Sequence, residues 1–260
     1  MDKGVRIVRP DMVQAYEPGG HAGTENRRLL KTDQVEVILA RMTRGGAAEG
    51  HFHRTTDQIV FILSGTGSVM KDGKIHDIGP DTLLHYPLGA IHGGEVPLNR
   101  TDRPLFFLVI YSPPLDPLDI FRVEDYKAGN SIHLISPDQV TPCRREVEAE
   151  CRRLLTTKNL EISLNKVPHG GGIVAEHTHA VNDQILYVVQ GTGDFVIGGE
   201  IVNIEHGTLV FIPKEVSHGV SVPANRVDSI LKTIVIHGLL KPDPKNLSAL
   251  EIVVNASGSG

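Results

Sequence analysis

The sequence has no tryptophan, and aromatic residues make up only 5% of its 260 residues. Proteins that bind single-stranded nucleic acid stack the bases on aromatic rings, so such a platform is not expected. The 26 basic residues are outnumbered by 31 acidic ones and form no basic run. Because phosphate backbones require a concentrated positive patch, nucleic acid is not an expected partner.

Long apolar runs are also missing. No stretch approaches the roughly 20 apolar residues that span a membrane as a helix, and residues 1–10 lack the apolar core of a secretory signal. The only two cysteines, Cys143 and Cys151, lie outside the repeated motifs described below. Without signs of secretion, we expect them to be reduced thiols and the protein to be cytoplasmic, with no membrane partner.

Helical periodicity is weak, and residues 144–155 are the only stretch in which a helix is considered. Apolar residues alternate in residues 35–42 and 160–167, as in half-buried strands, and run continuously in residues 59–63 and 185–189. Glycine turns at residues 71–74 and 197–200 fit tight hairpins. Short strands separated by such turns predict an all-β sandwich or barrel.

The chain contains an internal repeat. Residues 51–67 read HFHRTTDQIVFILSGTG and residues 177–193 read HTHAVNDQILYVVQGTG, an offset of 126 residues without a gap. The similarity extends through most of each half, which indicates duplication of one folding unit. We predict an N-terminal domain at residues 1–128, a C-terminal domain at residues 129–255 and a flexible tail at residues 256–260.

Three histidines recur at the repeat offset, although thirteen are spread along the chain. They form a His-x-His pair and a distant third histidine in each half, and alternate residues of an extended strand point the same way. A glutamine follows each pair by five residues. The two predicted sets of metal ligands are His51, His53, Gln58 and His92, and His177, His179, Gln184 and His218. Asp57 and Asp183 are alternatives to the glutamines, but the spacing to the following glycine favours the glutamines.

The motifs resemble those of the cupin superfamily. Its first motif fits Gly45, His51, His53, Gln58 and Gly65 and their repeats, and its second fits Pro87, Gly89 and His92 and, in the other half, Gly207, Pro213 and His218. The resemblance covers essentially the whole chain and implies two tandem jelly-roll barrels, each holding one metal ion. Two glycines of the second motif are replaced, by Asp81 and by Glu215, and the usual carboxylate ligand is glutamine in both halves.

The glutamines change the charge of the expected sites. Three imidazoles and a neutral amide leave a divalent metal with its full charge, which favours binding of an enolate, phenolate or carboxylate. Nitrogen-rich ligands suit iron, manganese, nickel, cobalt, copper or zinc, one ion per domain, and iron is favoured. With no carboxylate ligand, a catalytic base has to come from elsewhere.

Other residues recur near the expected sites. Arg41 and Lys166 could each present a cation to a substrate anion, or lie at the barrel rim in solvent. Tyr111 and His237 end corresponding strands and could transfer protons, although packing is the competing interpretation. His85 is expected in the core or at the rim. The remaining histidines are expected at the surface: His21, His76, His133, His169 and His206.

Three hypotheses for function follow. The first is a metal-dependent dioxygenase of a small enolisable or aromatic substrate, similar in layout to quercetinase-type bicupins. The second is a non-redox isomerase, cyclase or decarboxylase that acts through an enolate, similar to the bicupin isomerase of bacilysin synthesis. The third is a non-catalytic cupin that binds a small ligand. The expected partners are a small-molecule substrate, O2 for the first hypothesis, and a second copy of the chain in a homodimer.

Overall fold

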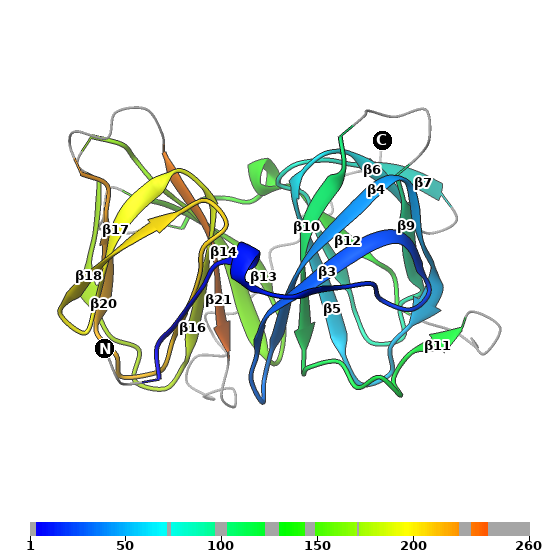
Figure 1. The fold of residues 1–260 in the computed structure, drawn as a ribbon, viewed down its shortest axis with the longest axis horizontal. Helices are drawn as coiled ribbons and strands as arrows, with labels where there is room; N and C mark the ends of the chain where they lie inside the picture. Colours follow the sequence, from blue (N-terminus) through cyan, green and yellow to red (C-terminus); the bar gives the residue numbers. More distant parts are fainter. Residues whose placement is uncertain are drawn as a thin grey trace.

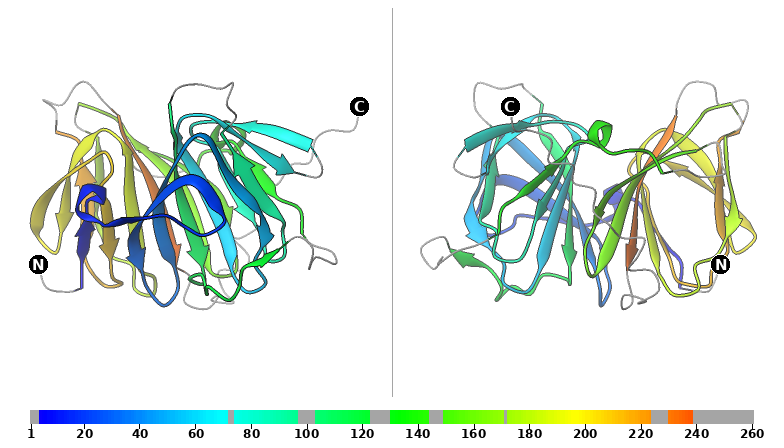
Figure 2. Two further views of the ribbon diagram at one scale, coloured as in Figure 1. Left: turned by 45° about the vertical axis from the view of Figure 1, so that its right-hand side comes forward. Right: turned by 180° about the vertical axis from the view of Figure 1, so that it is seen from behind.

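Two β-barrels lie side by side in the computed structural model (Figures 1 and 2). It describes residues 4–71, 74–96, 103–122, 130–143, 149–170, 172–223 and 230–238. Strands make up almost all the regular structure, with short 3-10 turns η1 (Pro10–Met12) and η3 (Pro137–Gln139). Among the described residues, no helix is long and apolar enough to cross a membrane. The predicted all-β class and the two tandem barrels are confirmed.

The N-terminal barrel is organised around one long strand, β4 (Glu36–Phe52). Its first part pairs with β10, and its last part crosses to pair with β9, so that a single strand links the two faces of the barrel. The other strands of this barrel are β2 (Ala15–Tyr16), β3 (His21–Lys31), β5 (Asp57–Ser64), β6 (Gly67–Lys71), β7 (Lys74–Ile78), β8 (Leu83–Tyr86), β9 (His92–Glu95), β10 (Leu105–Ser112) and β11 (Phe121–Arg122).

The C-terminal barrel repeats this plan with the long strand divided in two. Its strands are β13 (Glu150–Thr156), β14 (Leu160–Val167), β15 (Ile173–His177), β16 (Gln184–Gln190), β17 (Thr192–Ile197), β18 (Glu200–Glu205), β19 (Leu209–Ile212), β20 (His218–Ser221) and β21 (Leu231–Gly238). One sheet has the order β19-β16-β21-β14-β13, and the facing sheet has the order β15-β20-β17-β18.

The first strand of each half pairs with the barrel of the other half. β1 (Arg6–Val8) pairs with β19, and β12 (His133–Ile135) pairs with β8. The two domains therefore exchange strands across the predicted boundary. The boundary near residue 128 falls in residues 123–129, outside the described residues, and stays a prediction.

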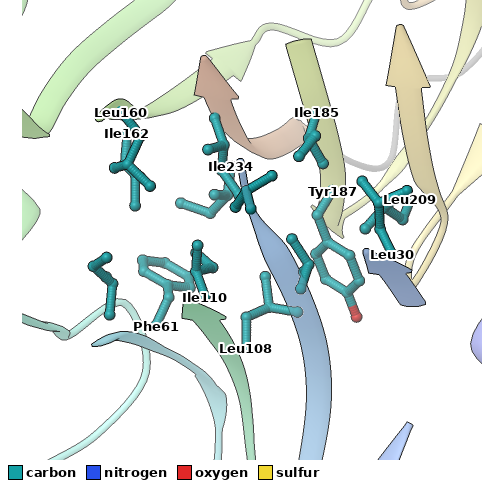
Figure 3. Close-up of a cluster of buried hydrophobic side chains, with 14 of the residues drawn as sticks. Leu30, Phe61, Leu108, Ile110, Leu160, Ile162, Ile185, Tyr187, Leu209 and Ile234 are labelled. Carbon is teal, nitrogen blue, oxygen red and sulfur yellow. The ribbon is translucent and has the colours of Figure 1, made fainter. Parts of the chain in front are cut away.

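Successive residues of the central strands face different cores. In β4, Val37 packs in an apolar cluster shared by both barrels, whereas Ile38 lines the interior of the N-terminal barrel. Figure 3 shows the shared cluster, in which Phe61, Leu108 and Ile110 lie opposite Ile162 and Ile234. The continuous apolar runs of the sequence are thus explained: these strands are buried on both faces, one towards the barrel interior and one towards the other barrel.

The stretch considered for a helix is partly a strand. Residues 150–156 form β13, which pairs with β14, and residues 144–148 lie outside the described residues. A register shift between Arg153 and Leu155 breaks the two-residue alternation, so buried Cys151, Leu154 and Leu155 acquire helix-like spacing. Cys143 and Cys151 face each other across an isolated β-bridge, and neither is in a disulfide bond.

The hairpin predicted at residues 197–200 is confirmed. Ile197 pairs with Glu200, and the two glycines between them both have positive φ, of 57° and 85°, as a two-residue turn of this hand requires. In the other half Lys71 pairs with Lys74, and the two residues between them are outside the described part. The predicted tail, residues 256–260, is outside it as well.

We expect the shared cluster to dominate stability. Phe61 is fully buried between the barrels, so Phe61→Ala should lower the free energy of unfolding by about 3–5 kcal/mol. Urea unfolding measures the change. Met70→Ala, at a side chain that is 60% exposed, is the control and should change stability by no more than about 0.5 kcal/mol. Equal effects of the two substitutions would contradict the assignment.

Candidate metal centres

Each barrel brings the three histidines of its repeat together. The N-terminal cluster (His51, His53, Gln58 and His92) has ring-centroid distances between its histidines of 5.1, 4.3 and 5.0 Å. In the C-terminal cluster (His177, His179, Gln184 and His218) the corresponding distances are 5.0, 4.5 and 5.2 Å. In both, one potential ligand atom per histidine lies within 4.8 Å of the others. Only the first histidine of each His-x-His pair is in a strand, at the end of β4 or β15.

Backbone carbonyls set the orientation of the N-terminal imidazoles. The Nδ1 atoms of His51, His53 and His92 lie 2.7, 2.7 and 2.8 Å from the carbonyl oxygens of Glu49, Asp119 and Ala90. A carbonyl only accepts, so each Nδ1 carries the proton and donates. The Nε2 atom of each ring is then an unprotonated lone pair, which is the form that binds a metal.

Gln58 adds an oxygen acceptor to these lone pairs. Its Oε1 atom lies 3.1 Å from Nε2 of His53 and 3.0 Å from Nε2 of His92. Two imidazole lone pairs and an amide oxygen that face one another repel unless a cation lies between them. The donor set therefore fits a divalent transition metal, with nitrogen and neutral oxygen ligands and no thiolate.

The two aspartates that sequence analysis gave as alternative metal ligands have another role. Asp57 accepts a hydrogen bond from the backbone N–H of Leu88 at 3.1 Å, and Asp183 accepts one from Lys214 at 2.9 Å. The two contacts are equivalent in the repeat and hold the loop that leads to the third histidine. The structure thus turns Gln58 and Gln184 towards the histidines.

The C-terminal cluster has a fourth imidazole beside it. Oε1 of Gln184 lies 2.8 Å from Nε2 of His179, 3.3 Å from that of His218 and 3.0 Å from that of His237. His237 is also in edge-to-face contact with His179, with ring centroids 4.9 Å apart. This cluster is the more open of the two, because His177 is exposed.

Tyr111 occupies the place of His237 in the N-terminal barrel. Its ring meets that of His53 edge to face, with centroids 5.9 Å apart, and its strand partner is Glu36. Burial, with smaller effects of Tyr16 and Glu36, raises the pKa of Tyr111 above its ordinary value. The phenol therefore stays protonated and can donate a hydrogen bond to an oxygen in the site.

A cavity of about 510 Å³ opens from the N-terminal cluster into the barrel. Its polar lining includes Tyr111, Glu36 and Arg28, and most of its wall is apolar. Glu36 is buried and accepts an ion-paired hydrogen bond from Nε of Arg28 at 2.5 Å, with Lys31 3.5 Å away. The volume suits a small organic molecule. In the C-terminal barrel, the buried Phe195 occupies the position that Val69 has in the cavity wall.

The structure places Arg41 and Lys166 away from the clusters. Both lie on the strand face that turns towards the other barrel, with Leu39 and Leu164 respectively. The cavity is lined by the alternate residues of β4, such as Ile38, and Lys166 lies 3.8 Å from a carboxylate oxygen of Glu150. The sequence showed that Arg41 and Lys166 share a strand face with Leu39 and Leu164. It did not show whether that face points into its own barrel or towards the other barrel.

Two residues that sequence analysis did not assign to the site lie beside the N-terminal cluster. His21, expected at the surface, lines the cavity, with its ring 5.6 Å from that of His51. Asp119, from the segment that joins the barrels, is 5% exposed and accepts hydrogen bonds from the backbone of Arg54 and Thr55 at 2.8 and 2.9 Å. No repeat or motif marks either residue, so their contacts come from tertiary structure alone.

Two barrels with a histidine-rich cluster in each define a two-domain metal-binding protein of the jelly-roll type. The chain belongs to the cupin family: the family model described as the cupin domain matches residues 38–111 and again residues 164–237. This confirms the resemblance inferred from the motifs. No curated protein matches the chain.

Solved bicupin structures share the fold. Ylba from E. coli has a TM-score of 0.68 at 12% identity, covering 90% of each chain. The oxalate decarboxylase of Lactobacillus farciminis has a TM-score of 0.67 at 14% identity, covering 89% of this chain and 85% of that one. A protein described as glyoxylate-induced from Pseudomonas aeruginosa has a TM-score of 0.70 at 11% identity, covering 92% and 89%. At such identities the likeness establishes the fold alone.

We expect Asp119 to hold His53 in place for metal binding. Burial alone would raise the pKa of its carboxyl, but hydrogen bonds from the Thr55 hydroxyl and from the two backbone N–H groups lower it, so the carboxylate is charged. These hydrogen bonds anchor the residue whose backbone carbonyl accepts from Nδ1 of His53. Asp119→Ala should weaken metal affinity of the N-terminal cluster by about 10–100-fold. A chelator competition titration in a His218→Ala background isolates this cluster. Asp116→Ala, in the same connecting segment, is the control, and an equal loss there would contradict the role.

The buried histidines make the metal-free protein sensitive to acid. Burial lowers the pKa of His51 and of His218 from 6.5 to about 4, and that of His92 well below 6.5. Below pH 6.5 the unfolded chain therefore binds more protons than the folded one. As the pH falls from 6.5 towards 4, stability should decrease by up to about 1.4 kcal/mol per pH unit for each histidine. Urea unfolding with chelator at pH 7, 6 and 5 measures the loss.

Two variants separate this effect from general acid sensitivity. His92→Leu removes one buried imidazole and should flatten the pH dependence, whereas His169→Gln, at an exposed position, should leave it unchanged. A wild-type stability that does not change between pH 6.5 and 5 would show that the histidines are not held neutral by burial.

Proposed function

We propose that this protein is a metal-dependent enzyme whose reaction takes place in the cavity of the N-terminal barrel. In our first hypothesis it is a dioxygenase of a small enolisable or aromatic substrate. The main supporting observation is the convergence of imidazole and amide lone pairs on one wall of a largely apolar cavity of about 510 Å³. A centre that only stabilises the fold needs no such adjoining space.

The ligands proposed for the N-terminal ion are His51, His53, Gln58 and His92. A divalent transition metal bound there would supply a Lewis acid for a substrate oxygen and, if redox-active, an electron path to O2. The apolar wall excludes water from the substrate, which strengthens every charge interaction inside the cavity. This wall includes Val60, Val69, Leu84, Leu105 and Val109.

Tyr111 is the proposed hydrogen-bond donor of the cavity. It lies beside His53, and its raised pKa keeps the phenol protonated at neutral pH. A protonated phenol can hydrogen-bond to a substrate oxygen and stabilise negative charge as it develops there. Glu36 is the residue that pairs with Tyr111 across the sheet, so a carboxylate lies beside the phenol. The ion pair with Arg28 holds the Glu36 carboxylate in the cavity wall.

A non-redox lyase or isomerase is the second candidate. Tyr111 and Glu36 are adjacent and are not among the proposed metal ligands. The phenol can hydrogen-bond to an enolate oxygen and the carboxylate can accept a proton, which suits a reaction that passes through an enolate. Two of the similar structures named above are also an oxalate decarboxylase and a glyoxylate-induced protein. A non-catalytic cupin that binds a small ligand is the least favoured hypothesis, because both halves keep a three-histidine cluster that such a protein does not need.

Oxygen consumption separates the two enzyme classes. We expect protein loaded anaerobically with Fe(II), Mn(II), Ni(II) or Cu(II) to consume O2 with at least one member of a panel of flavonols, β-diketones and catechols. His92→Ala should abolish this activity, whereas His218→Ala should retain it, since the cavity lies in the N-terminal barrel. An oxygen electrode and product analysis by mass spectrometry measure both.

The zinc-loaded protein is the control for the redox hypothesis, because zinc has no accessible second oxidation state. Turnover that is equally fast with zinc and without O2 would reject the dioxygenase and favour the lyase or isomerase. Loss of activity in His218→Ala but not in His92→Ala would move the active site to the C-terminal barrel.

A further inference from the structure

The segment that leaves the N-terminal barrel returns to its metal cluster as the short strand β11. Phe121 pairs with Phe52 and Arg122 pairs with His51 in an antiparallel register. Side chains of directly opposed residues lie on the same face of a sheet, with Cβ atoms about 5 Å apart. Arg122 is therefore the cross-strand neighbour of a proposed metal ligand.

The two faces of this strand pair are clearly distinguished. Phe52 and Phe121 stack with ring centroids 5.6 Å apart, and the guanidinium of Arg54 covers Phe121 at 3.8 Å from its centroid. This aromatic stack occupies the face away from the cluster. His51 and Arg122 share the opposite face, and both line the cavity. Because Arg122 is also exposed, it lies where the cavity opens to solvent.

Within the described part of the chain, the guanidinium of Arg122 has no ion-pair partner. The other arginine of the cavity, Arg28, is paired with Glu36. Two further carboxylates line the cavity, Glu49 and Glu95, and Glu95 accepts a hydrogen bond from Ser68 at 3.4 Å. Arg122 is thus a positively charged side chain beside the cluster that forms no ion pair with another described residue.

We propose that Arg122 is a specificity-determining residue that binds a carboxylate of the substrate at the cavity opening. The other oxygen of the same substrate is then held at the N-terminal cluster. The substrate class is a small organic anion with a carboxylate and a separate enol, keto or phenol oxygen. A guanidinium suits this function because its planar donors match a carboxylate in a two-point contact. The inference rests on the proposed function insofar as the cluster holds a metal ion.

The ligand set makes such an anion favourable. Four neutral ligands leave the full charge of the divalent ion, and Arg122 adds a second positive charge beside it. An anion that reaches from one to the other is attracted at both ends, whereas its neutral ester loses the contact with Arg122. A two-point contact between the guanidinium and a carboxylate should favour the acid over its ester by about tenfold in affinity.

Binding to the zinc-loaded protein tests this without turnover. The probes are 2-oxobutanoate, acetoacetate and 4-hydroxybenzoate, each compared with its methyl ester by isothermal titration calorimetry. These acids place the carboxylate at increasing distance from the other oxygen. We expect at least one acid to bind about tenfold or more tightly than its ester. Arg122→Met should remove this preference without weakening the ester, and Arg122→Lys should retain part of it.

One matched control and three contrary outcomes complete the test. Arg6→Met, at an arginine on β1 that lies over Phe211, is the matched control and should keep the wild-type preference. Loss of the preference in Arg41→Met instead of Arg122→Met would overturn the inference, as would an acid preference that survives Arg122→Met. Wild-type protein that binds every acid and ester equally would overturn it too.

The binding test of Arg122 and the O2-consumption test of the proposed function can fail independently of each other. An acid preference that depends on Arg122, in a protein that consumes no O2 with any metal, would leave the inference standing and reject the dioxygenase. Zinc content measured on each variant guards against indirect loss of the ion. A normal zinc content in Arg122→Met together with a lost acid preference supports direct contact with the substrate.

Discussion

The arrangement of the N-terminal site depends on one constraint, the need to neutralise lone pairs that point at a common centre. Backbone carbonyls accept hydrogen bonds from the Nδ1 atoms of its histidines, so the Nε2 atoms and the Gln58 oxygen face inward as acceptors. This cluster of acceptor atoms is unfavourable when neither water nor a cation lies between them, and favourable around a cation. The barrel supplies the rigidity that keeps these groups together, because the ligands come from β4, β5 and β9 and the turns beside them.

Rigidity in turn comes from packing between the barrels. Strands such as β5, β10, β14, β16 and β21 are covered on both faces, inside their own barrel and against the other one. The exchange of β1 and β12 ties each barrel to the other half of the chain. The fold is therefore a single packed unit of two repeats, and the geometry of one site is not independent of the neighbouring barrel.

Duplication has produced two sites that differ in their surroundings. Tyr111 and His237 hold the same repeat position, but one adds a phenol and the other a fourth imidazole. Val69 lines the N-terminal cavity where Phe195 packs in the C-terminal core, with its ring 6.2 Å from that of His218. The connecting segment adds Asp119 and Arg122 to the N-terminal site. These differences are the basis for proposing the reaction in the N-terminal barrel.

The sequence by itself determined the repeat, the all-β class and the candidate ligand sets, because each depends on local spacing. Strand alternation, glycine turns and the 126-residue offset can all be counted along the chain. The contacts of His21, Asp119 and Arg122, and the orientation of Arg41 away from the cavity, were decided only by tertiary structure. The physical reason is that parity gives two faces of a strand but does not say which one is inside, and pairing across about 70 residues, as between His51 and Arg122, leaves no local pattern.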